Sequence, residues 1–198
     1  AWLDTITTEL VAFEAETGCK AAPFGVNLIV HKSNETLQDE LAIVAKYKVP
    51  LVITSLGAVS DLIAEVHCYG GIVFHDVINM RHARKAVGAG VDGLIAVAAG
   101  AGGHTGQANP FGLVNEIKHE FDVTVLLSGS LSSGGDIAAA QMMGADFAYM
   151  GTRFIATEES MSQDDYKKMI VDAKASDIVL TDTITGVNAS FMTQSLNA

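Results

Sequence analysis

Residues 93–106 read GLIAVAAGAGGHTG, so an apolar run, Gly93–Ala99, leads directly into a glycine-rich turn with a histidine, Gly102–Gly106. Glycines let a backbone approach a ligand closely and expose N–H donors to it. Histidine exchanges a proton near neutral pH because of its ordinary pKa. The order of strand, glycine turn and histidine predicts a ligand-binding loop with His104 as its acid–base group. Taken alone, the pentapeptide is equally consistent with a tight loop and a solvated histidine.

Similar apolar runs recur along the chain, and each has the length of a strand buried on both faces. They are Phe24–Val30, Pro50–Leu56, Gly71–Val77, Gly93–Ala99, Val123–Gly129 and Phe147–Arg153. Helix-like stretches stand before and between them, at Asp4–Glu16, Thr36–Tyr47, Met80–Ala89, Phe111–Phe121 and Asp136–Gly144. This alternation predicts an α/β fold with parallel strands and helical crossovers. A doubly wound open sheet and a closed (β/α)₈ barrel both satisfy it.

The number of runs bears on the choice between these two folds. A TIM barrel has eight strands, whereas six runs are visible here and the chain opens on a helix. If the fold is a (β/α)₈ TIM barrel, its first two strands are absent here and the chain is an incomplete barrel; the family resemblance described below implies this fold. We treat residues 1–198 as a single partial barrel domain, because no low-complexity linker marks a second one. The tail, Ser176–Ala198, is expected to pack near the mouth of the barrel.

Composition excludes several classes of partner. The formal net charge is −11, which argues against nucleic acid and against anionic lipid, since both require clustered Lys and Arg. No apolar stretch approaches the ~20 residues of a membrane span. Cys19 and Cys68 lack the spacing of a disulfide framework or zinc site, so no metal is expected and a reducing compartment fits. We therefore expect a cytoplasmic protein that binds neither nucleic acid nor a membrane.

In parallel α/β folds, chemistry gathers at the carboxyl ends of the strands. The candidate residues there are Asn27, Ser55-Leu56-Gly57, His75-Asp76, Ala101-Gly102-Gly103-His104, Ser128-Gly129-Ser130 and Gly151-Thr152-Arg153. The last two groups are rich in glycine and hydroxyl side chains, and in barrels this position often binds phosphate through backbone N–H groups. Each glycine alone fits an ordinary turn. Together with Gly102-Gly103, they predict a phosphate-bearing cofactor. His75 fits either a pocket residue or a barrel-rim residue with its polar atoms satisfied.

Several of these segments in combination resemble the nitronate monooxygenases, formerly called 2-nitropropane dioxygenases. The resemblance covers most of the chain from about Phe24 onward. The matching segments are Phe24–Leu28, Met80–Ala83, Ala101–Gly106, Ser128–Ser130, Gly144–Asp146 and Met150–Ser160. The resemblance implies a TIM barrel that holds non-covalent FMN, a small-molecule substrate with O2 as co-substrate, and allows a homodimer.

The resemblance also implies roles for individual residues. His104 would be the catalytic histidine, and Ala101, Gly102 and Gly103 would lie along the flavin. The remaining cofactor residues would be Asn27 near the flavin ring and, at the FMN phosphate, Gly129, Ser130, Gly151 and Thr152. The chain departs from the family pattern at four positions: family members often have a lysine at Asp76, a polar residue at Val97, an acidic residue at Gly100 and a glycine at Ser130.

The activity implied is the oxidation of alkyl nitronates with O2 to carbonyl compounds and nitrite. His104 would stabilise the anion, or remove the proton α to the nitro group of a neutral nitroalkane. A flavin-dependent enoyl-acyl-carrier-protein reductase using NAD(P)H is the nearest alternative, because it shares the AGGH histidine. A non-catalytic FMN-binding barrel is another. IMP dehydrogenase shares part of the phosphate region, but neither Cys19 nor Cys68 follows a suitable strand end.

Overall fold

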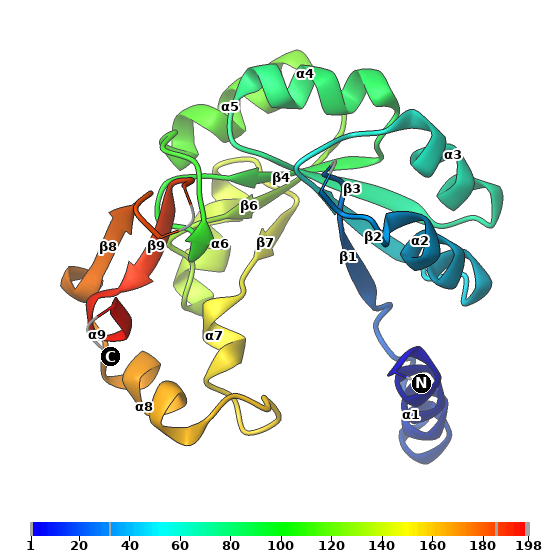
Figure 1. Ribbon diagram of the computed structural model, residues 1–198, viewed down its shortest axis with the longest axis horizontal. Coiled ribbons are helices and arrows are strands. Elements are labelled where there is room, and N and C mark those ends of the chain that lie inside the picture. Colours follow the sequence, from blue (N-terminus) through cyan, green and yellow to red (C-terminus); the bar gives the residue numbers. More distant parts are fainter. Residues whose placement is uncertain (1, 32, 185, 197–198) are drawn as a thin grey trace. The chain divides into compact units, whose positions relative to one another are not determined.

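The computed structural model describes residues 2–31, 33–184 and 186–196. The described chain forms two compact units. The first comprises the residues up to His75 together with Ala89–Val91, and the second comprises Asp76–Gly88 and the residues from Asp92 onward. Figure 1 follows the chain through both units.

The first unit begins with helix α1 (Trp2–Thr17) and then alternates strands with helices. Its elements are β1 (Gly25–Ile29), α2 (Leu37–Lys46), β2 (Leu51–Ser55), α3 (Ser60–Cys68) and the larger part of β3 (Ile72–Val77). The strands are parallel in the order β1-β2-β3, with Gly25 opposite Leu51 and Leu51 opposite Ile72. Val52 of β2 and Val73 of β3 are fully buried.

Helix α3 is the one main crossover that the sequence reading omitted. Its buried residues are Leu62, Ile63 and Val66, whose spacing is that of one helix face. The helix is only nine residues long and Gly70-Gly71 follow it closely, so its helical period was not recognised in the sequence. In contrast, α1 carries no buried residue. A hydrogen bond links it to the end of α2, where the Tyr47 hydroxyl donates to the carboxylate of Asp4 in α1 at 2.7 Å.

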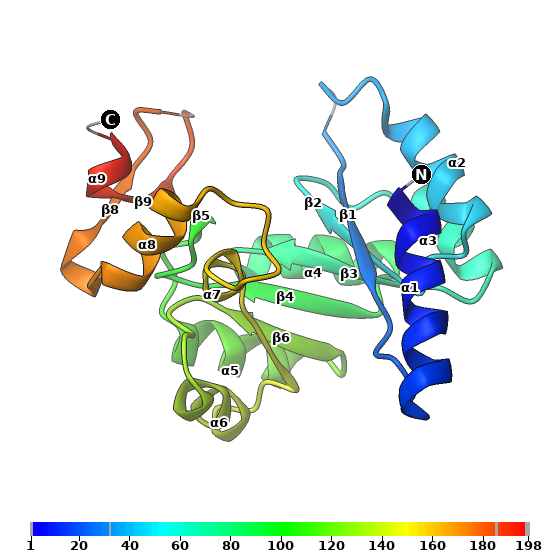
Figure 2. The same cartoon turned by 90° about the horizontal axis from the view of Figure 1, so that it is seen from below.

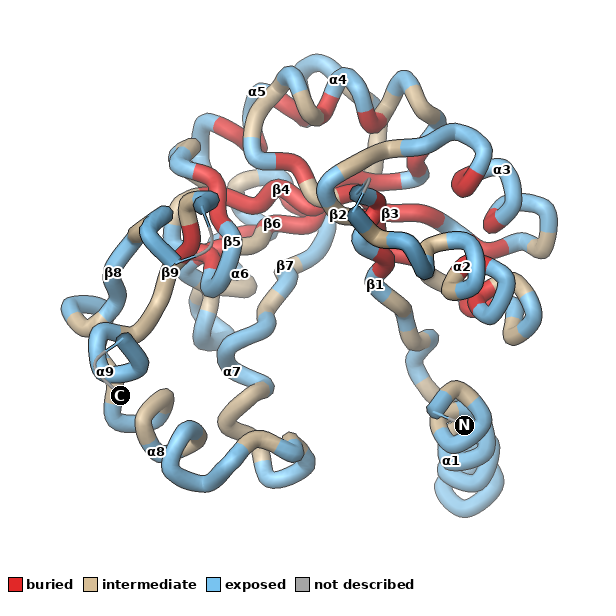
Figure 3. Tube along the Cα trace, in the orientation of Figure 1, coloured by how far each residue is buried: buried red, intermediate tan, exposed pale blue. Residues whose placement is uncertain are grey.

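The second unit contains α4 (Met80–Ala89), three further parallel strands and two long crossover helices. The strands are β4 (Gly93–Val97), β6 (Thr124–Ser128) and β7 (Phe147–Tyr149), and the helices are α5 (Pro110–Glu120) and α6 (Gly134–Met142). Pairing runs β4-β6-β7, with Gly93 opposite Thr124 and Leu126 opposite Phe147. Every residue of β4 is buried, as Figure 3 shows by the continuous red along this strand.

The second unit ends in short elements that include a small antiparallel sheet. These elements are α7 (Thr152–Ile155), α8 (Asp164–Asp172), the 3₁₀ turn η1 (Ala175–Asp177), β8 (Ile178–Thr181), β9 (Ala189–Met192) and α9 (Thr193–Leu196). β9 lies between β8 and the two-residue strand β5 (Gly103–His104), as Figure 2 shows from another side. The tail therefore contacts the predicted catalytic turn, as expected, although residues 185, 197 and 198 lie outside the described part.

The predicted α/β fold is confirmed, with six parallel strands in the described residues, three associated with each unit. These are βα repeats of the barrel type, and the described residues do not form a closed barrel. One strand boundary was wrong. The run Phe147–Arg153 is extended only through Tyr149, because the chain turns at Gly151 and α7 begins at Thr152.

Candidate functional site

The loop that follows β4 is closed at its base by backbone hydrogen bonds. The N–H of Ala98 donates to the carbonyl of Ser128 at 2.9 Å, and the N–H of Ala99 donates to the carbonyl of Ala108 at 2.9 Å. Ala98 and Ala101 are buried, whereas Gly102, Gly103 and His104 are exposed. The loop thus has an anchored base and presents its glycine turn and histidine to solvent.

The turn that follows β6 packs directly against this loop. The N–H of Ser130 donates to the carbonyl of Gly100 at 3.0 Å. Gly129 has a φ of +125°, and a Cβ there would lie 2.9 Å from the carbonyl oxygen of Ala99 and 3.0 Å from that of Ala98. Only glycine fits such a close backbone approach with this φ.

The turn that follows β7 approaches the same loop from another strand. A Cβ at Gly102 would lie only 2.5 Å from Thr152 Oγ1, so Gly102 and the first residue of α7 are near neighbours. Gly103 and Gly151 have no atom within 4 Å of the place where a side chain would begin. The structure therefore brings together three of the predicted cofactor segments: Ala101–Gly103, Gly129–Ser130 and Gly151–Thr152.

Asn27 belongs to the first unit and lies exposed on β1. Its Oδ1 accepts a hydrogen bond from the Ser55 hydroxyl at 3.0 Å, so two of the residues predicted at strand ends are partners. Its predicted role beside the flavin ring stays a prediction.

His104 is held in register by the tail of the chain. β5 pairs antiparallel with β9, with Gly103 opposite Ser190 and His104 opposite Ala189. The backbone N–H of Thr105 donates to the carbonyl of Asn188 at 3.2 Å and extends the pairing by one residue. Ala189 is 1% exposed, whereas His104 is exposed. The sequence reading found His104 but missed the residues 188–190 that fix its backbone.

Thr105 and Gly106 secure the other side of the histidine. The buried Thr105 hydroxyl donates to the carbonyl of Ala98 at 2.9 Å and lies 3.0 Å from the carbonyl oxygen of Gly106. A Cβ at Gly106 would lie 2.5 Å from the carbonyl oxygen of Val97 and 2.9 Å from Ile78 Cβ. The chain therefore passes tightly over the end of β4 immediately after His104.

Tyr149 and Asp76 form an electrostatic pair that the sequence reading did not identify. Tyr149 ends β7, and Asp76 stands near the end of β3. Burial raises the pKa of the Tyr149 phenol, and the negative charge of Asp76 raises it further. The position of Tyr149 just before Met150-Gly151 in the family-like motif was the available signal.

The hydrogen-bonding groups at the N-terminus of α6 find their partners in neighbouring residues of the chain. The Asp136 carboxylate accepts from the N–H groups of Ser132 at 2.9 Å and Ser133 at 2.8 Å, and the Ser133 hydroxyl caps the helix in return. These bonds, first that from the Ser132 backbone, lower the pKa of Asp136. Because a capping box fills this helix N-terminus, the cofactor candidates remain the turns before it and before α7.

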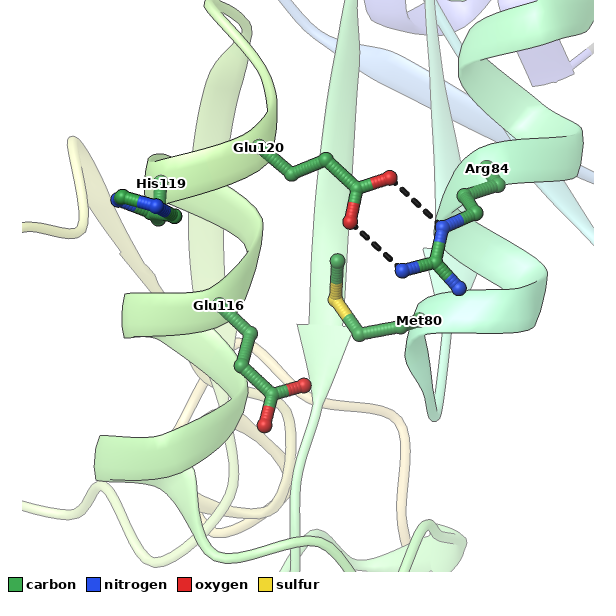
Figure 4. A pocket seen from close by; sticks show the side chains of 5 residues that line it. All are labelled: Met80, Arg84, Glu116, His119 and Glu120. Carbon is green, nitrogen blue, oxygen red and sulfur yellow. Dashed lines mark hydrogen bonds and ion pairs between the residues drawn. The ribbon is translucent and has the colours of Figure 1, made fainter.

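The remaining candidates do not join this cluster. His75 is buried, with Nδ1 2.7 Å from Thr54 Oγ1, which agrees with the reading of a histidine whose polar atoms are satisfied within the fold. A hollow of about 450 Å³ lies between α4 and α5 and is lined by Met80, Arg84, Glu116, His119 and Glu120. Figure 4 shows Arg84 forming a bidentate ion pair with Glu120 there, with both N–O distances at 2.7 Å. His119 points away from this pair. None of the residues that line this hollow is a predicted site residue.

The described ranges contain neither a membrane-spanning helix nor a cluster of metal ligands. No helix among residues 2–31, 33–184 and 186–196 has both the length and the apolar character to cross a bilayer. Over the same ranges, no cluster of three or more His, Cys, Asp or Glu side chains could hold a metal ion.

Comparison with known proteins identifies the family. The family model described as nitronate monooxygenase matches residues 11–196. A nitronate monooxygenase from Paraburkholderia phytofirmans is 30% identical over 80% of this chain and 46% of its own length. The chain spans about half the length of the curated relatives it matches.

Solved structures agree with this result. FabK from Thermotoga maritima, as an M276A mutant, is 31% identical with a TM-score of 0.80 over 96% of this chain and 61% of its own. A nitroalkane oxidase from Streptomyces ansochromogenes is 25% identical with a TM-score of 0.78 over 96% of this chain and 66% of its own. The family resemblance inferred from the glycine–histidine turn and the Met150–Ser160 motif is confirmed. The chain belongs to the nitronate monooxygenase family.

Proposed function

We propose that the protein is an FMN-dependent nitronate monooxygenase that oxidises alkyl nitronates with O2 to carbonyl compounds and nitrite. The observation that carries the proposal is the convergence of two glycine-containing turns, 129–130 and 151–152, on the glycine-rich loop of His104. Gly102 lies against Thr152, and Gly129 and Ser130 lie against residues 98–101. The family match over residues 11–196 supplies the reaction class.

The residues present fit a flavin nucleotide. Gly103 and Gly151 leave open space where side chains would stand, so a planar ring or a phosphate can approach the backbone. We assign Ala101, Gly102 and Gly103 to the flavin edge. For the FMN phosphate, Gly129, Gly151 and Thr152 offer backbone N–H groups, and Ser130 and Thr152 offer their hydroxyls, because the Ser130 N–H already donates to the Gly100 carbonyl. Bound FMN supplies the electron-accepting chemistry, which these side chains lack.

His104 has the place and the chemistry to act on the substrate. It is exposed at the tip of the loop, and its backbone is fixed by β9 on one side and by Thr105 on the other. In the protonated form its imidazolium stabilises an anionic nitronate. In the neutral form it removes the proton α to a nitro group. Gly100, in place of a carboxylate, leaves no negative side chain there to repel an anion.

A flavin-dependent enoyl-acyl-carrier-protein reductase is the second candidate. The observation in its favour is the similarity to FabK, with a TM-score of 0.80. Such an enzyme would accept a hydride equivalent from NAD(P)H and would not need O2. The same loop and histidine serve either reaction, so substrate use separates the two candidates.

An absorbance experiment tests the proposal. The purified chain is titrated with FMN, then divided and treated without oxygen with propionate-3-nitronate or with NADPH. We expect uptake of FMN and bleaching of the flavin by the nitronate, with nitrite formed when air is admitted. Bleaching by NADPH alone would favour the reductase. A chain that takes up FMN and responds to neither compound would indicate a non-catalytic barrel, and failure to take up FMN would overturn the proposal.

A further inference from the structure

Gly100 and Ser130 face each other across two turns and interlock. The Ser130 N–H donates to the Gly100 carbonyl at 3.0 Å. A Cβ built on Gly100 would fall on the Ser130 hydroxyl and lie 3.2 Å from Ser130 Cβ. The space that a side chain at position 100 needs is thus already filled by the side chain at position 130.

Both residues also adopt left-handed backbone conformations, with a φ of +87° at Gly100 and +55° at Ser130. Such a φ is strained for serine and is retained only where its surroundings hold it. Here the surroundings are the hydrogen bond to Gly100 and the close backbone approach of Gly129 to Ala98 and Ala99. The two turns therefore have little freedom to separate.

We propose that Gly100 and Ser130 form one positioning unit that sets the distance between the turn after β4 and the turn after β6. The Ser130 side chain occupies the space of a side chain at position 100 and fixes the position of residues 98–101. The position of Gly102–His104, which follow directly, is fixed with them. A side chain at position 100 requires the Ser130 hydroxyl to leave its present rotamer and still meets Ser130 Cβ at 3.2 Å, whereas loss of the Ser130 side chain removes both contacts. The departures at Gly100 and Ser130 noted in the sequence are then one coupled change.

The unit also determines the charge at this junction. With Ser130 in its present rotamer, its hydroxyl occupies the place where a side chain at position 100 would begin, so the junction offers a neutral hydroxyl and not a carboxylate. A hydroxyl can donate a hydrogen bond to an anion, whereas a carboxylate repels one. We infer that the unit favours anionic groups at this edge of the site. This last step rests on the proposed function, whereas the steric coupling does not.

A double-mutant cycle tests the coupling without any cofactor. Gly100→Ala, Ser130→Gly and the double variant of the full chain are unfolded with urea. Gly144→Ala is the matched control, because Gly144 has a φ of +98° and no atom within 4 Å of a new Cβ. We expect Gly100→Ala to raise the unfolding equilibrium constant about tenfold more than Gly144→Ala does. In the Ser130→Gly background the two substitutions should have equal effects.

The remaining outcomes are also decisive. Additive effects in the cycle would overturn the proposal. If Gly100→Ala alone does not fold and the double variant does, the coupling is supported; if neither folds, removing the Ser130 side chain has not freed the space and the proposal is wrong.

An FMN titration of the same proteins, followed by flavin fluorescence, separates the two claims. We expect affinity to fall in Gly100→Ala, and we expect the double variant to bind FMN as tightly as Ser130→Gly alone, because neither of these two proteins has the Ser130 hydroxyl and in neither does position 100 meet it. Coupling in the urea cycle with no FMN uptake by the unmodified chain would leave the interlock standing and remove the proposed function. FMN uptake together with additive effects in the urea cycle would overturn the coupling of Gly100 and Ser130 and leave the proposed function standing.

Discussion

The hydroxyl of Thr105 donates a hydrogen bond to the carbonyl oxygen of Ala98 at 2.9 Å, and Thr105 is buried where it does so. Its backbone N–H donates at the same time to the carbonyl of Asn188 at 3.2 Å. One residue, adjacent to His104, therefore joins the end of β4 to the tail that contains β9. The position of the imidazole depends on both bonds.

Thr105→Val is expected to destabilise the protein. Valine keeps the shape and loses the hydroxyl, so the carbonyl of Ala98 keeps only the longer hydrogen bond from the Ala101 N–H at 3.3 Å. The free energy of unfolding should fall by about 0.5–1.5 kcal/mol, measured by urea denaturation. Thr7→Val is the control, because the Thr7 hydroxyl also bonds to a carbonyl, that of Leu3 at 2.7 Å, but on an exposed helix face. Equal effects of the two substitutions would contradict the importance of the buried bond.

Gly106→Ala is expected to disturb the loop through overpacking. The new methyl would lie 2.5 Å from the carbonyl oxygen of Val97, the last residue of β4, and 2.9 Å from Cβ of Ile78 in the bend that follows β3. Such crowding costs about 1–3 kcal/mol of unfolding free energy. Gly112→Ala on α5 meets no atom within 4 Å and should be neutral or stabilising by about 0.5–1 kcal/mol. An unchanged urea midpoint for Gly106→Ala would show that the loop relaxes.

His104→Asn is expected to retain FMN and lose turnover. Asparagine keeps polarity on β5 but cannot exchange a proton near neutral pH, so the rate with nitronate or nitroalkane should fall by about 10² to 10⁴. The measurement pairs the flavin absorbance spectrum with oxygen consumption. His119→Asn, on the exposed face of α5, is the control and should leave both unchanged. Unchanged turnover in His104→Asn would remove this residue from the mechanism.

Tyr149 is expected to ionise at higher pH than an ordinary phenol. Burial raises its pKa above 10.0, with a smaller contribution from Asp76, so the folded protein favours the neutral phenol. This contribution to stability is complete below pH 10 and is lost as the pH rises through the raised pKa. Tyrosinate absorbance, compared with that of Tyr149→Phe, isolates this group.

Asp76→Asn should lower the Tyr149 pKa only part of the way, because burial is the larger cause. Full return to the ordinary value would show that charge dominates. No change would show that the two side chains do not interact.

The alternation of apolar runs with helical stretches was sufficient to predict the parallel βα repeats. Strands such as β4 are buried on both faces, and that burial leaves a continuous apolar run in the sequence. His104 and the glycine turns were also predicted, because a ligand-binding backbone requires glycine at fixed places beside strand ends. The convergence of Gly102 with Thr152, and of Gly129 with Ala98 and Ala99, is consistent with those predictions.

Only the tertiary structure revealed the partners of these residues. The pairing of β5 with β9 joins His104 to Ala189, and no local period marks a two-residue strand. The steric conflict between a side chain at position 100 and the Ser130 side chain could not be predicted from the sequence either, since it arises where turns from different strands meet. Local patterns encode which face of an element is buried and where a turn must bend. Which turns then touch is decided by the packing of the strands that carry them.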